Sequence, residues 1–342
     1  MKGKLVSIFK YLFFLLIGFV LLFLAFKNIE LSKVWIELKQ ANYSWILGSM
    51  FFALLSHYFR AKRWNQLINQ MDYKTSTTTT FYAVMIGYLA NLALPRLGEV
   101  TRCMVLGKKE KIPFNSLFGT VIAERVFDLL ILILIIVVVF LSQIDRIGNL
   151  LNRVIITPLL GTYTGSLQSI FIIFGSLILM VVIGIIVFKK LKPWLKTTML
   201  YDKIDAFLNG FVDGLKSIAN LKQRNLFLFN TLMIWVLYLA MIIFPFYSFE
   251  ETSVLGVIDG MTVLAIGSLG IIAPVPGGIG SYHFIITELF TQLYDIPAQA
   301  AIAYATANHA AQTLLVLLAG GTSYILLFLN KKQALNDITE KD

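Results

Sequence analysis

Six charged residues lie within otherwise apolar stretches of the chain and are the first candidates for chemistry. They are Arg96, Glu99, Arg102, Glu124, Arg125 and Asp128. A spacing of three places the first three on one face of a helix, and a spacing of four does the same for Glu124 and Asp128. Inside a membrane each such charge costs at least ~2.5–3.5 kcal/mol at mid-bilayer on insertion scales. The six formal charges sum to zero, so we expect them to lie close together.

Two interpretations of this charged cluster remain open. It is either a self-neutralising structural network, or a site where an arginine holds a phosphate and a carboxylate exchanges a proton or counter-cation. The guanidinium group offers a planar fork of donors that suits phosphate oxygens. Asn91 precedes the helix-breaking Pro95 and belongs to the same polar stretch.

A second cluster follows Pro274 and comprises Gly277, Gly278, Gly280, Ser281 and His283. The glycines do not form a dinucleotide fingerprint, because no βαβ pattern surrounds them. Glycine permits positive φ and close backbone approach. Ser281 is expected to N-cap a helix running to about Tyr294, whose N-terminus would suit an anionic head group. The alternative is a tight turn between two packed helices.

The three histidines, His57, His283 and His309, lack the spacing of a metal-binding motif, so we expect no metal and no cofactor. Two roles remain open for His283 and His309. One is structural, with a bond to Glu288 or bonds through Asn308 and Gln312 to neighbouring helices, and the other is a proton relay.

Composition fixes the class of protein that must position these residues. Of 342 residues, 58% are hydrophobic and 14% are charged, whereas a soluble domain carries ~25% charged residues. Mean hydropathy is +0.78. These values exclude a cytosolic enzyme and a disordered chain and predict an all-α polytopic membrane protein. The lone Cys103 cannot form an internal disulfide, and the net charge of +10 is typical of basic cytoplasmic loops rather than of nucleic-acid binding.

Six long apolar runs are expected to span the membrane, the first as a retained helix rather than a signal peptide. They are Ile8–Phe26, Ser44–Phe59, Leu117–Leu141, Ser169–Phe188, Leu226–Tyr247 and Ala300–Leu329. Two runs that stop at proline, Phe81–Leu94 and Val254–Ala273, are expected to be re-entrant or broken, although an eight-span variant remains possible.

The distribution of basic residues predicts that both termini are cytoplasmic. It places Arg60, Lys62, Arg63 and Lys74 on the cytoplasmic side, and makes 189–224 a cytoplasmic amphipathic segment.

An internal repeat organises the runs. Residues 86–93 resemble residues 266–273 at an offset of 180. Each of the two short runs has one long apolar run before it and one after it. Three full crossings in each half invert the second half relative to the first, as in many secondary transporters. We therefore expect a single membrane domain, 1–342, with halves 1–167 and 168–342.

Three blocks carry a resemblance to a known family. They are NLALPRLGEVTR at 91–102, VIAERVFD at 121–128 and PVPGGIG at 274–280. With these blocks in order, nearly the whole chain resembles the flippase-like membrane domain of bacterial phosphatidylglycerol lysyltransferases and its stand-alone relatives. The resemblance implies that the charged cluster and the 276–280 turn line or support a lipid path. Many relatives carry Glu where this chain has His283, and the aminoacyltransferase domain is not represented, so lysyl transfer is not expected.

The function expected from the residues and the resemblance together is movement of a lipid with an anionic or modified phosphate head group between leaflets. No ATPase motif is present, so the chain is expected to act without nucleotide hydrolysis and not as an enzyme. The alternatives are a membrane scaffold for a lipid-modifying or glycan-exporting enzyme, and an integral membrane enzyme on a lipid-linked substrate. The expected partners are membrane lipids and such an enzyme, not nucleic acid, and the expected location is a bacterial inner membrane.

Overall fold

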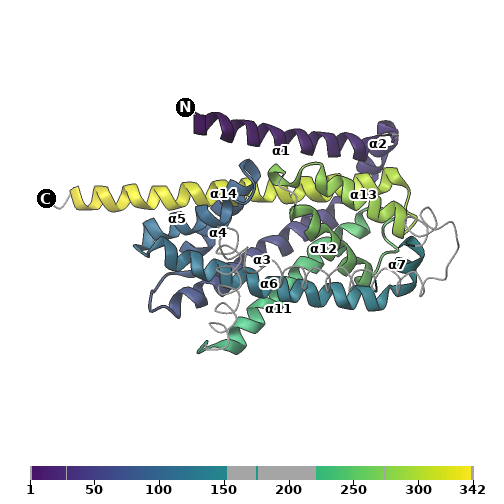
Figure 1. Ribbon diagram of the computed structural model, residues 1–342. Coiled ribbons are helices and arrows are strands. Elements are labelled where there is room, and N and C mark those ends of the chain that lie inside the picture. Colours follow the sequence, from purple (N-terminus) through teal and green to yellow (C-terminus); the bar gives the residue numbers. More distant parts are fainter. Residues whose placement is uncertain (1, 28, 152–174, 176–220, 273–274, 340–342) are drawn as a thin grey trace, which may run out of the picture. The chain divides into compact units, whose positions relative to one another are not determined.

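The computed structural model describes residues 2–27, 29–151, 175, 221–272 and 275–339 (Figure 1). These residues are helical or lie in turns, and none of them forms a strand. The predicted all-α polytopic membrane fold is thereby confirmed. The chain divides into two compact units, Met1–Glu124 with Ala219–Asp342, and Arg125–Ile218.

The first unit contains nine helices among its described residues. They are α1 (Lys2–Phe26), α2 (Leu31–Gln40), α3 (Tyr43–Asn69), α4 (Thr77–Ala93), α5 (Gly98–Glu110), α11 (Arg224–Ile243), α12 (Val257–Ile272), α13 (Ser281–Leu293) and α14 (Ala298–Thr339). Two short 3-10 turns, η2 (Phe244–Ser248) and η3 (Pro276–Gly278), interrupt the sequence between them. Helix α6 (Phe114–Ser142) begins in the first unit and continues into the second, where α7 (Ile144–Leu151) follows.

Three described helices are long and apolar enough to cross a membrane: Phe114–Ser142, Arg224–Ser248 and Ala298–Leu327. A fourth span would combine Tyr11–Phe26 with Leu31–Gln40, which are bent by 87° relative to each other. The predicted run Ser169–Phe188 and the amphipathic segment 189–220 lie outside the described residues.

Helix α3 differs from its prediction at the C-terminal end. The apolar run was expected to stop at Phe59, but the helix continues to Asn69. Arg60, Lys62 and Arg63 therefore lie within the helix, and their cytoplasmic side stays a prediction. Residues 60–69 contain no proline or glycine, so nothing in the sequence breaks the helix there.

Helices α3 and α11 run antiparallel. The Asn42 N–H, just before α3, donates to the Ser248 carbonyl at 3.0 Å, just after α11. At the other end the Lys222 N–H donates to Gln70 Oε1 at 3.5 Å. These two helices occupy equivalent places in the two predicted halves. An inverted repeat requires such equivalent helices to run in opposite directions.

The order of the elements repeats along the chain. Helices α3, α4, α5 and α6 begin 180 to 184 residues before α11, α12, α13 and α14, respectively. Each half thus contains a long helix, a shorter apolar helix, a break, a 13-residue helix and a long final helix. The boundary between the halves at 167 and 168 stays a prediction.

The first break, residues 94–97, separates α4 from α5 and contains Pro95, the predicted helix breaker. A Cβ atom on Gly98 would overlap the Gly87 carbonyl oxygen, so α4 and α5 approach backbone to backbone here. Asn91 Oδ1 accepts a hydrogen bond from the Gly98 N–H at 2.6 Å and holds the start of α5. The prediction that Arg96 shares a helical face with Glu99 and Arg102 is wrong. Arg96 precedes α5, has a φ of +64°, and is exposed.

The second break contains three glycines with positive φ: Gly277 at 60°, Gly278 at 74° and Gly280 at 84°. The backbone of Gly280 lies directly against that of Gly18 in α1, where no side chain would fit. Ser281 is the first residue of α13 and not its N-cap, which is Gly280. Its hydroxyl donates to the Gly278 carbonyl at 3.1 Å and so closes the turn instead of capping the helix.

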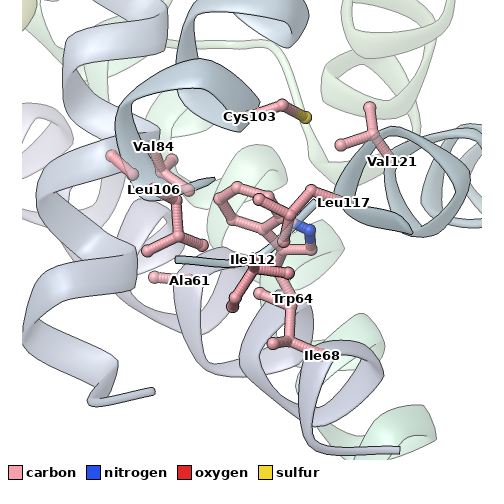
Figure 2. Packing of buried hydrophobic residues seen from close by; sticks show 10 residues of the cluster. Ala61, Trp64, Ile68, Val84, Cys103, Leu106, Ile112, Leu117 and Val121 are labelled. Carbon is pink, nitrogen blue, oxygen red and sulfur yellow. The ribbon is translucent and has the colours of Figure 1, made fainter. Parts of the chain in front are cut away.

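A buried apolar cluster joins α3, α4, α5 and the start of α6 (Figure 2). Its largest member is Trp64, whose side chain is fully buried among Leu106, Ile112 and Leu117. This cluster fixes the ends of four helices relative to one another. It borders the charged residues of α3, α5 and α6 described below.

Candidate functional site

Arg102 and Glu124, two of the predicted site residues, form a buried ion pair. Arg102 Nη2 donates to Glu124 Oε2 at 2.7 Å, and neither side chain is more than 4% exposed. A third residue, Arg63 of α3, lies with its Nε 3.5 Å from Glu124 Oε1 and is also fully buried. One carboxylate therefore holds two guanidinium groups, from α3 and α5. We name Arg60, Arg63, Arg102 and Glu124 the arginine cluster.

The Trp64 ring packs against the Arg102 guanidinium. The Arg102 guanidinium carbon lies 4.5 Å from the centre of the indole ring, which is within the range of a cation–π interaction. The indole N–H donates to Thr120 Oγ1 at 2.8 Å, so the ring itself is fixed in place. Arg102 Nε is buried and has no hydrogen-bond partner among the described residues. The guanidinium is thus held at one edge and has a free donor at another.

Helix α11 completes the arginine cluster on the α3 side. Arg63 Nη1 donates to Thr231 Oγ1 at 3.2 Å and its guanidinium lies over the Phe227 ring. One turn earlier, Arg60 Nε donates to the Tyr238 hydroxyl at 3.1 Å. Because buried charges are costly unless paired and hydrogen-bonded, these contacts explain how three arginines are tolerated inside an apolar bundle.

The remaining predicted residues of the charged stretch occupy different environments. Glu99 and Asn91 are half-buried, whereas Arg125 is exposed and Asp128 is buried. Arg125 and Asp128 belong to the second compact unit. The structure thus brings together Arg102 and Glu124 of the predicted set and adds residues that the sequence analysis missed.

The missed residues are Arg60, Arg63 and Trp64. The two arginines were interpreted only as markers of the cytoplasmic side, because basic residues after an apolar run usually have that meaning. A usable signal was present: Arg60 and Arg63 are three residues apart and share a helical face once the helix is extended.

The second predicted cluster also converges in the structure. The rings of His283 and His309 lie 4.9 Å apart, centre to centre. His309 Nε2 is 2.9 Å from the Gly277 carbonyl, which only accepts hydrogen bonds, so Nε2 must carry the proton. The Asn308 amide donates to the Tyr282 hydroxyl at 2.8 Å. The suggested pairing of His283 with Glu288 gives way to ring contacts with Tyr282 and His309.

Within the described ranges, no group of three or more His, Cys, Asp or Glu side chains is placed to hold a metal ion. The described residues thus form an arginine cluster in one half and a group of tyrosine, histidine and asparagine side chains in the other.

These features define a polytopic helical membrane protein with buried polar clusters at two helix breaks. The chain belongs to the family of the lysylphosphatidylglycerol synthase TM region, whose model matches residues 11–320.

Two curated proteins are similar in sequence to this chain. Glycosyltransferase AglD of Haloferax volcanii is 20% identical over 333 residues, which cover 91% of this chain and 53% of the relative. UPF0104 membrane protein MJ1595 of Methanocaldococcus jannaschii is 28% identical over 117 residues, or 33% of this chain and 35% of the relative. The chain thus spans about half or less of the curated relatives it matches. No solved structure matches it.

Proposed function

We propose that this protein moves a lipid with an anionic phosphate head group between the leaflets of a cell membrane, without an ATPase of its own. The observation that carries the proposal is the incomplete hydrogen bonding of the Arg102 guanidinium. Its Nη2 is held by Glu124, while its buried Nε has no partner among the described residues. A phosphate oxygen is the acceptor that a fixed guanidinium of this kind binds best.

Polar residues near the cluster support the same proposal. Half-buried Glu99 lies on α5, one turn before Arg102, half-buried Asn91 lies in the last turn of α4, and exposed Arg96 lies in the break between α4 and α5. A head group would pass these residues on its way to Arg102, while its acyl chains remain in the surrounding lipid. The two halves would then rock against each other around the bound head group.

The test is lipid translocation in proteoliposomes. A fluorescent phosphatidylglycerol is reconstituted with the protein, and its transfer between leaflets is measured by chemical quenching from outside. Arg102→Ala is expected to slow translocation about 10- to 100-fold, because a hydrogen bond to a charged group contributes about 1.5–3 kcal/mol. Arg102→Lys retains the charge and the ion pair but not the fork, so it also slows translocation while keeping the fold.

The matched control is Lys222→Ala, which removes an exposed basic residue at the start of α11. It is expected to leave the rate unchanged. Equal rates for wild type, Arg102→Ala and Arg102→Lys would remove the arginine cluster from lipid movement and refute the proposal.

A second candidate function, work on a lipid-linked glycan, is favoured by the similarity to AglD, which is named a glycosyltransferase. It would make the chain an integral membrane enzyme or the membrane partner of one. A changed lipid mass after incubation with the protein distinguishes this function from translocation, which leaves the lipid chemically unchanged.

A further inference from the structure

The two breaks carry equivalent residues of different charge. Glu124 is the eleventh residue of α6, and Asn308 is the eleventh residue of α14. The sequence that begins at Glu124 is Glu-Arg-x-x-Asp, and the one that begins at Asn308 is Asn-His-x-x-Gln. The second half thus has amides where the first half has carboxylates, and an imidazole where the first half has a guanidinium.

The same pairs of helices are joined in both halves, from different helix positions: Arg102 is the fifth residue of α5 and Tyr282 is the second residue of α13. In the first half α5 bonds to α6 through Arg102 and Glu124, and in the second half α13 bonds to α14 through Tyr282 and Asn308. An ion pair in one half thus corresponds to a hydrogen bond between uncharged groups in the other. The rings of His283 and His309 and the carbonyl of Gly277 lie around this second bond.

Several buried polar atoms of this second group have no hydrogen-bond partner among the described residues. They are His283 Nδ1, Asn308 Oδ1 and Thr287 Oγ1, on side chains of residues that are at most 6% exposed. His283 and Thr287 are one turn apart on α13 and share a face. Buried polar groups in native proteins are nearly always paired, so these atoms call for an occupant that can both donate and accept hydrogen bonds.

We propose that Tyr282, His283, Thr287, Asn308 and His309, with the Gly277 carbonyl, form a second head-group site that binds uncharged vicinal hydroxyl groups. A hydroxyl donates to Asn308 Oδ1 or to an unprotonated His283 Nδ1 and accepts from its other neighbours. The Tyr282 and His309 rings, whose centres lie 5.7 Å apart, offer aromatic faces beside these polar atoms. This proposal rests on the proposed function: the arginine cluster takes the phosphate, and this site selects among phosphate lipids by their hydroxyl groups.

The experiment compares two lipids that differ only in hydroxyl groups. Phosphatidylglycerol has a phosphodiester and a three-carbon diol, and phosphatidylpropanol has the same phosphodiester and three carbons without hydroxyls. The purified full chain is mixed with both in equal amounts, and native mass spectrometry gives the ratio of bound lipids. Wild type is expected to favour phosphatidylglycerol on the order of tenfold, as two net hydrogen bonds would give. Phosphatidylinositol, added as a third arm, distinguishes a cyclic polyol from a glycerol diol.

Three variants test the site. His283→Phe keeps the ring and removes its nitrogens, Asn308→Leu removes the carboxamide, and Thr287→Val removes the hydroxyl. Each is expected to reduce the preference at least threefold while both lipids still bind. Asn65→Leu, which removes an equally buried carboxamide from α3, is the matched control and should leave the ratio unchanged.

The outcomes separate this proposal from the one on which it rests. Arg102→Lys should weaken binding of both lipids equally and leave their ratio intact. Loss of that common weakening refutes the phosphate site, whereas the ratio alone reports on the hydroxyl site. A wild-type ratio near one, or a ratio that His283→Phe and Thr287→Val leave unchanged, would mean that water fills the cluster and would overturn the inference.

Discussion

Glu124 illustrates how strongly a single side chain can determine the local charge balance. Its two carboxylate oxygens face Arg63 and Arg102, and none of the three side chains is more than 4% exposed. Replacing one partner of a buried ion pair leaves the others uncompensated in a medium that solvates charge poorly.

We therefore expect Glu124→Gln to lower the free energy of unfolding by about 3–5 kcal/mol. Thermal or denaturant unfolding in mild detergent measures this difference. Glu30→Gln, which breaks the exposed pair of Glu30 with Lys33, is the control and should cost at most about 1 kcal/mol. Equal destabilisation by the two substitutions would show that the buried pair has no special weight.

At this scale the sequence predicted half of the arginine cluster. The types and spacing of Arg102 and Glu124 identified them, because charges inside apolar runs are rare. Arg63 and Trp64 were missed because their roles depend on α3 continuing past Phe59, which the spacing of Arg60 and Arg63 could have indicated, and on the packing of α11, which no local pattern reports. A bond from Asn308 to a neighbouring helix was among the expectations, but its partner Tyr282 was not identified, because the bond joins two helices.

Among the elements, the contact between α4 and α5 depends on glycine. A methyl group on Gly98 would overlap the Gly87 carbonyl oxygen and the Asn91 carboxamide. We expect Gly98→Ala to push the two helices apart and to destabilise the fold by about 1–3 kcal/mol, as overpacking does.

The control for Gly98→Ala is Gly119→Ala in α6, where a Cβ atom meets nothing within 4 Å. Alanine is the better helix former by about 0.8–1.0 kcal/mol, so this second substitution should stabilise the protein. Opposite signs in unfolding measurements confirm the close approach of α4 and α5, and stabilisation by both substitutions would contradict it.

Element boundaries were well predicted where proline and glycine interrupt an apolar run, as at Pro95 and before α13. They were poorly predicted at Phe59, where charge was taken as the end of the helix. A charged side chain does not end a helix; it only changes what the helix can pack against.

For the whole molecule, the contacts at the two ends of α3 divide the segments that connect the helices into two groups. One group lies at each end of the pair formed by α3 and α11. The Asn42 N–H, just after α2, donates to the Ser248 carbonyl at the end of η2, so these two segments lie close together. The opposite end of α3 lies beside Lys222. An antiparallel pair about 40 Å long is enough to separate these two groups of segments by a bilayer.

We expect cysteines placed in the two groups of segments to label from opposite sides. In a Cys103→Ser background, Val254→Cys, at a residue 81% exposed, should react with an impermeant maleimide on intact cells. Lys74→Cys, at an exposed residue after α3, should react only after permeabilisation, because the basic segments are expected inside. Labelling of both from the same side would refute the predicted topology and with it the inverted halves.

The position of Trp64 has an optical consequence. The emission of an indole depends on the electric field across its ring, and here that field comes from a positive charge 4.5 Å above the ring centre. Any event that draws Arg102 away from the ring or neutralises its charge changes the colour or intensity of Trp64 fluorescence. The protein thus contains its own fluorescent reporter at the arginine cluster, and no dye needs to be attached to follow changes there.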